Sequence, residues 1–67
     1  MDAKKMNHAE YQKKVRGMSE AQLRYTIKDA GEAAECGKHI GNPNTGYYLD
    51  EVNYCCDELA RRARAVA

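Results

Sequence analysis

The sequence predicts an all-α fold built on an antiparallel helical hairpin, with helices over about residues 19–36 and 45–65. Three observations support this. First, a helix-start signature precedes a row of apolar residues at helical spacing. Second, a run of turn-forming residues separates that row from a second apolar row. Third, no segment shows the alternation of apolar and polar residues that is typical of a strand. The 67 residues suffice for one domain at most. We divide the chain into an N-terminal basic helix or arm, residues 1–17, and a helical hairpin domain, residues 18–67.

The first hairpin helix begins with a capping box. Ser19 is followed three residues later by Gln22, so each side chain can bond the backbone N–H at the other position. Gly31 costs this helix about 1 kcal/mol relative to Ala, or else permits close approach of a partner helix. Gly37 and Gly41 are natural C-terminal stops. The apolar residues recur at i, i+4, i+7 and i+11 and define one face: Leu23, Ile27, Ala30 and Ala34.

A turn and a second striped helix follow. Residues 41–46 read Gly-Asn-Pro-Asn-Thr-Gly, and each of these residue types favours turns. The helix after them is predicted from about Thr45 to Ala65. Its apolar residues recur every three or four positions and form one continuous stripe: Tyr48, Val52, Cys55, Leu59, Ala63 and Val66.

The N-terminal segment is less clearly patterned. We predict a helix over about residues 3–16, or a frayed arm, because its apolar positions make a poor stripe: Met6, Ala9 and Val15. A chain this short also buries only a small core. Small domains of this kind usually gain stability from disulfides, a metal or a second subunit, so we expect a homodimer or a chain stabilised by its partner.

Charge is distributed unevenly along the chain. The net charge is +1, but residues 1–18, 19–58 and 59–67 carry +3, −5 and +3. The C-terminal arginines have a structural explanation, because they favour the helix C-terminus and form acid-first pairs, Asp57 with Arg61 and Glu58 with Arg62. The N-terminal lysines stay open as phosphate contacts. They support an alternative function, a small nucleic-acid-binding regulator that uses the basic arm.

The cysteines allow two interpretations. The first is a zinc-stabilised interaction module. Cys36 and His39 have the spacing of metal ligands, and Cys55 with Cys56 would complete a set of four ligands. Adjacent residues on a helix point about 100° apart, however, so this pair suits one metal poorly. The other interpretation places Cys55 in the core and Cys56 at its edge, with no metal ligands. Three cysteines without a signal peptide or long apolar run indicate a reduced, cytoplasmic chain and no membrane partner.

We predict no enzyme activity, no catalytic residues and no cofactor. The sequence shows no nucleophile elbow, and its glycines match no phosphate-binding loop. A helical hairpin also lacks the concave volume that catalytic sites need. With catalysis set aside, we predict that the protein functions by binding a partner.

Tyrosine and carboxylate residues share helix faces outside the predicted core. Tyr47 and Tyr54 are seven residues apart and interleaved with Glu51 and Glu58. Tyrosine is enriched at binding hot spots, but it also covers the edge of a thin core with its hydroxyl in water, so both explanations remain open. The predicted partner-binding residues are Tyr25, Asp29, Glu32, Tyr47, Asp50, Glu51 and Tyr54.

Two segments resemble small phage-encoded accessory proteins. They are QLRYTIKD at residues 22–29 and the pattern GYYxDEVxYCxxELxRR at residues 46–62. The similarity covers about residues 18–62 and excludes the N-terminal extension. It implies a non-enzymatic protein that binds and inhibits or redirects a host protein, as an anti-defence or host-takeover factor. An acidic surface that mimics nucleic acid would suit a CRISPR complex or a nuclease as the target, in the cytoplasm of an infected bacterium.

Overall fold

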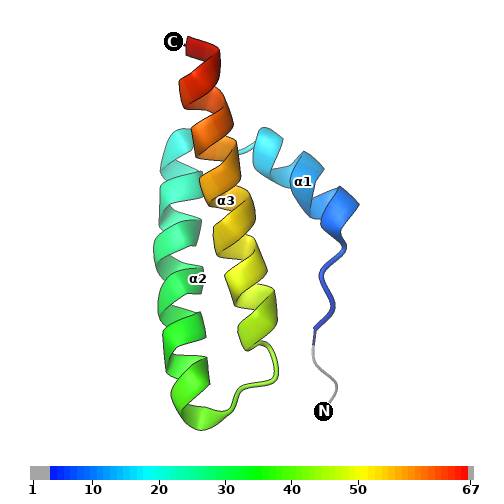
Figure 1. Ribbon diagram of the computed structural model, residues 1–67, viewed down its shortest axis with the longest axis vertical. Coiled ribbons are helices and arrows are strands. Elements are labelled where there is room, and N and C mark those ends of the chain that lie inside the picture. The colour runs from blue at the N-terminus through cyan, green and yellow to red at the C-terminus, as the bar shows by residue number, and fades with distance from the viewer. Residues whose placement is uncertain (1–3, 67) are drawn as a thin grey trace.

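The computed structural model describes residues 4–66, which form three helices and no strand within that range (Figure 1). The helices are α1 (His8–Arg16), α2 (Glu20–Ile40) and α3 (Thr45–Val66). α2 and α3 lie side by side as an antiparallel hairpin, and the shorter α1 packs on α3. The predicted all-α fold and its hairpin are therefore confirmed. None of the described helices is both long and apolar enough to cross a membrane.

The predicted start of α2 is confirmed by its capping box. The backbone N–H of Gln22 donates to Ser19 Oγ at 3.1 Å, and the N–H of Ser19 donates to Gln22 Oε1 at 2.8 Å. These two bonds satisfy backbone donors that the first turn of a helix leaves without partners.

The end of α2 lies four residues beyond the predicted position 36, because Gly37 does not stop the helix. A Cβ on Gly37 would lie 2.5 Å from Thr45 Oγ1 and 3.1 Å from Asn42 Cβ, so glycine lets the turn fold back against the helix. Gly41 ends α2 instead, with a left-handed φ of +70°. At Gly31 a Cβ would meet only Val52 Cγ2 at 4.0 Å, so close approach occurs at Gly37 and not at Gly31.

α1 begins later than predicted. The side chain of Asn7 accepts from the N–H of Glu10 at 3.2 Å and caps a helix that starts at His8. Residues 4–7 are not helical, and residues 1–3 of the predicted span lie outside the described residues. The backbone N–H of Lys4 donates to Asn44 Oδ1 at 2.7 Å, which ties this segment to the turn between α2 and α3.

The core lies where the three helices meet. Its four buried side chains come from all of them: Tyr11, Val15, Leu23 and Cys55. The predicted face of α2 is confirmed, because Ala30 and Ala34 are also buried and Ile27 is half-buried. Residues 1–17 thus include two side chains of this core.

The predicted stripe of α3 holds only in part. Cys55 is buried, and Tyr48, Val52 and Leu59 are half-buried, but Ala63 is exposed and Val66 is 87% exposed. The last turns of α3 extend past the first turn of α2, so no neighbouring helix covers them (Figure 1).

Candidate binding surfaces

The α2 face, which we define as Tyr25, Asp29 and Glu32, lies on the outer side of the hairpin. All three side chains are exposed, and Tyr25 is 69% exposed. Their spacing of four and three residues places them on one side of the helix. The structure therefore brings these three predicted residues together on an open surface.

Beside Tyr25 a shallow groove of about 390 Å³ separates the end of α1 from the start of α2. Its surface is mainly apolar. The exposed ring of Tyr25 forms part of its wall and connects the groove to the two carboxylates of the α2 face. The lining residues are Lys14, Met18, Ala21, Gln22, Tyr25 and Thr26.

The prediction that the four site residues on α3 are exposed is wrong. Tyr47, Asp50, Glu51 and Tyr54 are all half-buried. The physical reason is α1 and the segment before it, which pack on this side of α3. Lys4 Nζ lies 5.2 Å from the ring centroid of Tyr47, at the distance of a cation–π contact.

Tyr11 covers this side of α3, and the sequence analysis did not identify it as a core residue. Its hydroxyl donates to Glu51 Oε2 at 2.8 Å, and its ring centroid lies 5.8 Å from that of Tyr54. Burial, followed by the hydrogen bond to Glu51, raises the pKa of Tyr11. The signal that would have found it is the spacing of Tyr11, Val15 and Met18, which places all three on one helix side.

His8 adds a second bond from α1 to the same side. Its Nδ1 lies 2.8 Å from the hydroxyl of Tyr54, and the two rings pack with centroids 5.7 Å apart. Tyr54 and Glu51 are thus engaged within the chain. Their hydroxyl and carboxylate hold α1 in place.

Glu58 is the one buried charged residue among the described residues, although the sequence placed it on an outer face. Its side chain accepts from Arg61 Nε and Nη2 at 2.9 and 2.7 Å, and from Arg62 Nε at 2.7 Å. Hydrogen bonds from Arg61 and Arg62 lower the pKa of Glu58 to about 2. The predicted pair of Glu58 with Arg62 is confirmed, but Arg61 binds Glu58 and not Asp57 as predicted.

Arg62 continues this network to the end of α1. Its Nη2 donates to the carbonyl oxygens of Met18 at 2.6 Å and of Val15 and Arg16 at 3.3 Å. These carbonyls include acceptors that the last turn of a helix leaves free. Arg62 therefore caps α1 from a position more than 40 residues away in the sequence.

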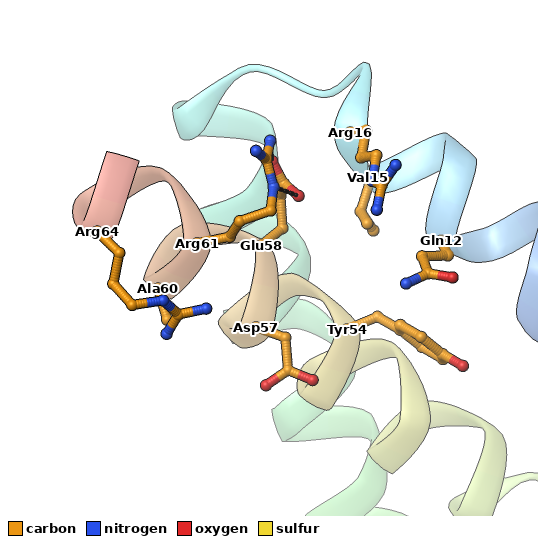
Figure 2. Close-up of a pocket in the computed structure, with 9 residues that line it drawn as sticks. All are labelled: Gln12, Val15, Arg16, Tyr54, Asp57, Glu58, Ala60, Arg61 and Arg64. Atoms are coloured by element: carbon orange, nitrogen blue, oxygen red, sulfur yellow. Dashed lines mark hydrogen bonds and ion pairs between the residues drawn. The ribbon is translucent and has the colours of Figure 1, made fainter. Parts of the chain in front are cut away.

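A cavity of about 310 Å³ opens between α1 and the second half of α3 (Figure 2). Two of its arginines, Arg16 from α1 and Arg64 from α3, come from opposite ends of the chain, and Arg61 lies between them with Glu58. Asp57 contributes one exposed carboxylate. The lining residues are Gln12, Val15, Arg16, Tyr54, Asp57, Glu58, Ala60, Arg61 and Arg64.

The cysteines have different environments. Cys55 is buried, and burial raises the pKa of its thiol, whereas Cys36 and Cys56 are exposed, and all three are free. His39 is exposed, and its Nε2 lies 3.9 Å from Glu35 Oε1. Among residues 4–66 no group of three or more His, Cys, Asp or Glu side chains is arranged to hold a metal ion.

Comparison of the chain with known protein families, curated proteins and solved structures finds no match.

Proposed function

We propose that the protein is a non-enzymatic binding protein that engages a partner protein through the α2 face and the groove beside it. The observation that carries this proposal is the exposed ring of Tyr25 at the wall of an apolar groove. Tyrosine supplies a large apolar contact with a polar tip at low conformational cost, which is why it is frequent at binding hot spots.

The chemistry of this surface describes its partner. Asp29 and Glu32 place two negative charges next to an apolar contact, so the partner presents an apolar side chain to the groove and basic side chains beside it. The resemblance to phage accessory proteins supports a host protein in the bacterial cytoplasm, such as a nuclease or a CRISPR complex. Basic grooves that hold nucleic acid fit an acidic surface of this kind.

Binding to a host lysate tests the proposal. Immobilised wild-type protein is expected to retain a discrete host protein, and Tyr25→Ala is expected to reduce its recovery at least tenfold, as truncation of a hot spot does. The matched control is Tyr47→Ala, which removes a tyrosine from the side that α1 covers. Equal retention by wild type and Tyr25→Ala would exclude the α2 face as the binding surface, and loss with Tyr47→Ala alone would assign binding to α3.

A second candidate function is nucleic-acid binding, and one observation favours it. The fold brings basic residues from the two ends of the chain to one cavity, where Arg16 and Arg64 are both exposed. Phosphate contacts of this type weaken steeply with salt. Binding of DNA or RNA that is lost in Arg16→Gln/Arg64→Gln but kept in Lys38→Gln would support this function, and no binding at low salt would exclude it.

The proposal includes self-association as a homodimer. Among the described residues six apolar side chains are buried, which is few for a chain of 67 residues. A second subunit is one of the usual means by which so small a domain gains stability.

A further inference from the structure

Two adjoining cavities form one groove between α1 and α3, which we call the α1–α3 groove. The cavity of about 310 Å³ (Figure 2) adjoins a second one of about 260 Å³, and Tyr54 and Asp57 line both of them. The lining residues on α3 follow one another at whole helix turns, so they face the same side of the helix. The groove is defined by His8 and Arg16 of α1 and by Asp50, Tyr54, Asp57 and Arg64 of α3.

The end of the groove beside the last turns of α3 is basic. Arg16 and Arg64 are both exposed there, and neither forms an ion pair with any of residues 4–66. Glu58 lines the same cavity, but Arg61 and Arg62 already bind its carboxylate. Arginine binds phosphate oxygens through paired N–H groups. This end of the groove is therefore suited to a phosphate.

The other end of the groove is aromatic. The ring of Tyr54 lines both cavities, and the ring of His8 lies beside it, with centroids 5.7 Å apart. The contact of the Tyr54 hydroxyl with His8 Nδ1, at 2.8 Å, fixes the position of the Tyr54 ring. Nucleic-acid bases stack on aromatic side chains, and any unpaired base can make this contact. The distance between the two ends therefore separates a site for a base from a site for its phosphate.

Two carboxylates flank Tyr54. Asp50 lies one turn before it and Asp57 one turn after it, and all three residues line the smaller cavity. Within the described part of the chain neither carboxylate forms an ion pair. A carboxylate accepts hydrogen bonds from the amino group of a base such as cytosine, whereas thymine presents a carbonyl oxygen at the same position. The groove therefore favours a base whose edge carries an amino group.

We propose that the α1–α3 groove binds one nucleotide with an unpaired, amino-bearing base. Arg16 and Arg64 bind its phosphate, its base packs on the ring of Tyr54, and the amino group of the base donates to Asp50 or Asp57. A single strand or a free nucleotide supplies this chemistry, whereas a duplex keeps its bases paired and stacked. The inference rests on the second candidate function, nucleic-acid binding, and names the unit that is recognised.

Fluorescence anisotropy of end-labelled DNA strands, about 12 nucleotides long, tests the inference at neutral pH and low salt. A strand of cytosine alone and a strand of thymine alone carry equal numbers of phosphates, so a difference in affinity reports the base. Wild type is expected to bind the cytosine strand at least about fivefold more tightly than the thymine strand. It is also expected to bind the cytosine strand more tightly than the duplex of that strand with its complement, although the duplex carries twice as many phosphates.

Two charge-neutralising variants test the role of the carboxylates. Asp50→Asn/Asp57→Asn is expected to lose the preference for cytosine, because an amide also donates to the carbonyl oxygen of thymine. The matched control is Asp29→Asn/Glu32→Gln, which removes two negative charges from the α2 face and is expected to keep the preference. Circular dichroism checks that both variants keep their helices. A preference that survives in the first variant, or disappears in the control, would overturn the inference.

The remaining outcomes separate this inference from the function on which it rests. Wild type that binds cytosine and thymine strands equally, or a strand and a duplex equally, would overturn the inference and leave nucleic-acid binding through Arg16 and Arg64 standing. Absence of binding by both strands, the duplex and cytidine monophosphate would exclude the two together. Cytidine monophosphate added as a competitor distinguishes the sources: displacement of the cytosine strand identifies a free nucleotide as a sufficient ligand, and no displacement assigns the groove to a strand.

Discussion

Arg62 joins α3 to the end of α1 through one guanidinium group. It binds the buried carboxylate of Glu58 through Nε and the carbonyls at the end of α1 through Nη2. A lysine has neither the planar fork nor the reach for both sets of acceptors. The position of α1 on α3 therefore depends on the identity of this residue and not only on its charge.

We expect Arg62→Lys to lower the free energy of unfolding by about 2 kcal/mol, the size of hydrogen bonds to charged groups. Arg64→Lys, on an exposed arginine of the same helix, is the control and should change stability by less than about 0.5 kcal/mol. Urea unfolding followed by circular dichroism measures both. Equal midpoints for the two variants would show that Arg62 acts only as a positive charge.

Glu58 makes stability depend on pH in the acid range. Hydrogen bonds from Arg61 and Arg62 hold its pKa at about 2 in the folded chain, against 4.5 for an ordinary glutamate. The unfolded chain therefore binds this proton at a higher pH than the folded chain does. The contribution is complete above about pH 4.5 and is lost as the pH falls toward 2.

We expect the thermal midpoint of wild type to fall between pH 4.5 and 2, and we expect Glu58→Gln to remove that part of the pH dependence. Glu32→Gln, on the exposed α2 face, should keep the wild-type profile. Differential scanning calorimetry over this range gives the comparison. An unchanged slope in Glu58→Gln would show that other carboxylates cause the acid sensitivity.

At the scale of the helices, the two interior glycines of α2 have opposite roles. A Cβ on Gly37 would collide with the turn, at 2.5 Å from Thr45 Oγ1, whereas one on Gly31 would make only ordinary contact with Val52. Alanine favours a helix interior over glycine by up to about 1 kcal/mol. The lower helix propensity of glycine is thus offset by packing against the turn at Gly37, but not at Gly31.

We expect Gly31→Ala to raise the free energy of unfolding by roughly 0.5–1 kcal/mol and Gly37→Ala to lower it. The two variants carry the same substitution on one helix, so each is the control for the other. Thermal unfolding at equal protein concentration distinguishes them. A stabilised Gly37→Ala variant would mean that the turn moves away from α2 at little cost.

Local signals explain which parts of this architecture the sequence could predict. The capping box at Ser19 and the left-handed stop at Gly41 act within a few residues, so α2 and the turn after it follow from neighbouring positions. The contact that Tyr11 makes with Glu51 spans 40 residues, and the bond from Arg62, the partner of Glu58, to Val15 spans 47. Spacing alone gave no means of placing α1 on the side of α3 that carries Glu51 and Tyr54.

The same limit applies to the candidate binding residues. Of the seven predicted, the three on α2 are exposed because no other helix packs on their side, and the four on α3 are half-buried because α1 does. A tyrosine–carboxylate face has the same pattern in the sequence whether it meets another protein or another helix of its own chain. Only the position of α1 separates the two cases.

At the scale of the whole molecule, α1 is part of the core and not an appendage. Tyr11 and Val15 belong to the cluster of buried side chains that also contains Leu23 and Cys55. Without α1 the hairpin would expose Leu23 and Cys55 and leave Arg62 without its carbonyl acceptors. The hairpin domain predicted at residues 18–67 therefore shares its stabilising contacts with the segment before it.

We expect a chain of residues 18–67 to lose on the order of 3–6 kcal/mol of stability, the contribution of burying two large side chains. Such a loss is comparable to the total stability of many small domains. The effect is measured by comparing the helical content and the sharpness of the thermal transition of this fragment with those of the full chain. A fragment that unfolds as cooperatively and at the same temperature as the full chain would show that the hairpin is independent.

The three thiols have a practical consequence, since Cys36 and Cys56 are exposed whereas Cys55 is enclosed. An alkylating reagent reaches Cys36 in every state of the protein. It also reaches Cys56, which is exposed. Cys55, adjacent in sequence but enclosed, reacts only when the helices come apart. Counting labelled cysteines by mass spectrometry would thus follow the global opening of the fold through the third label, with no added probe.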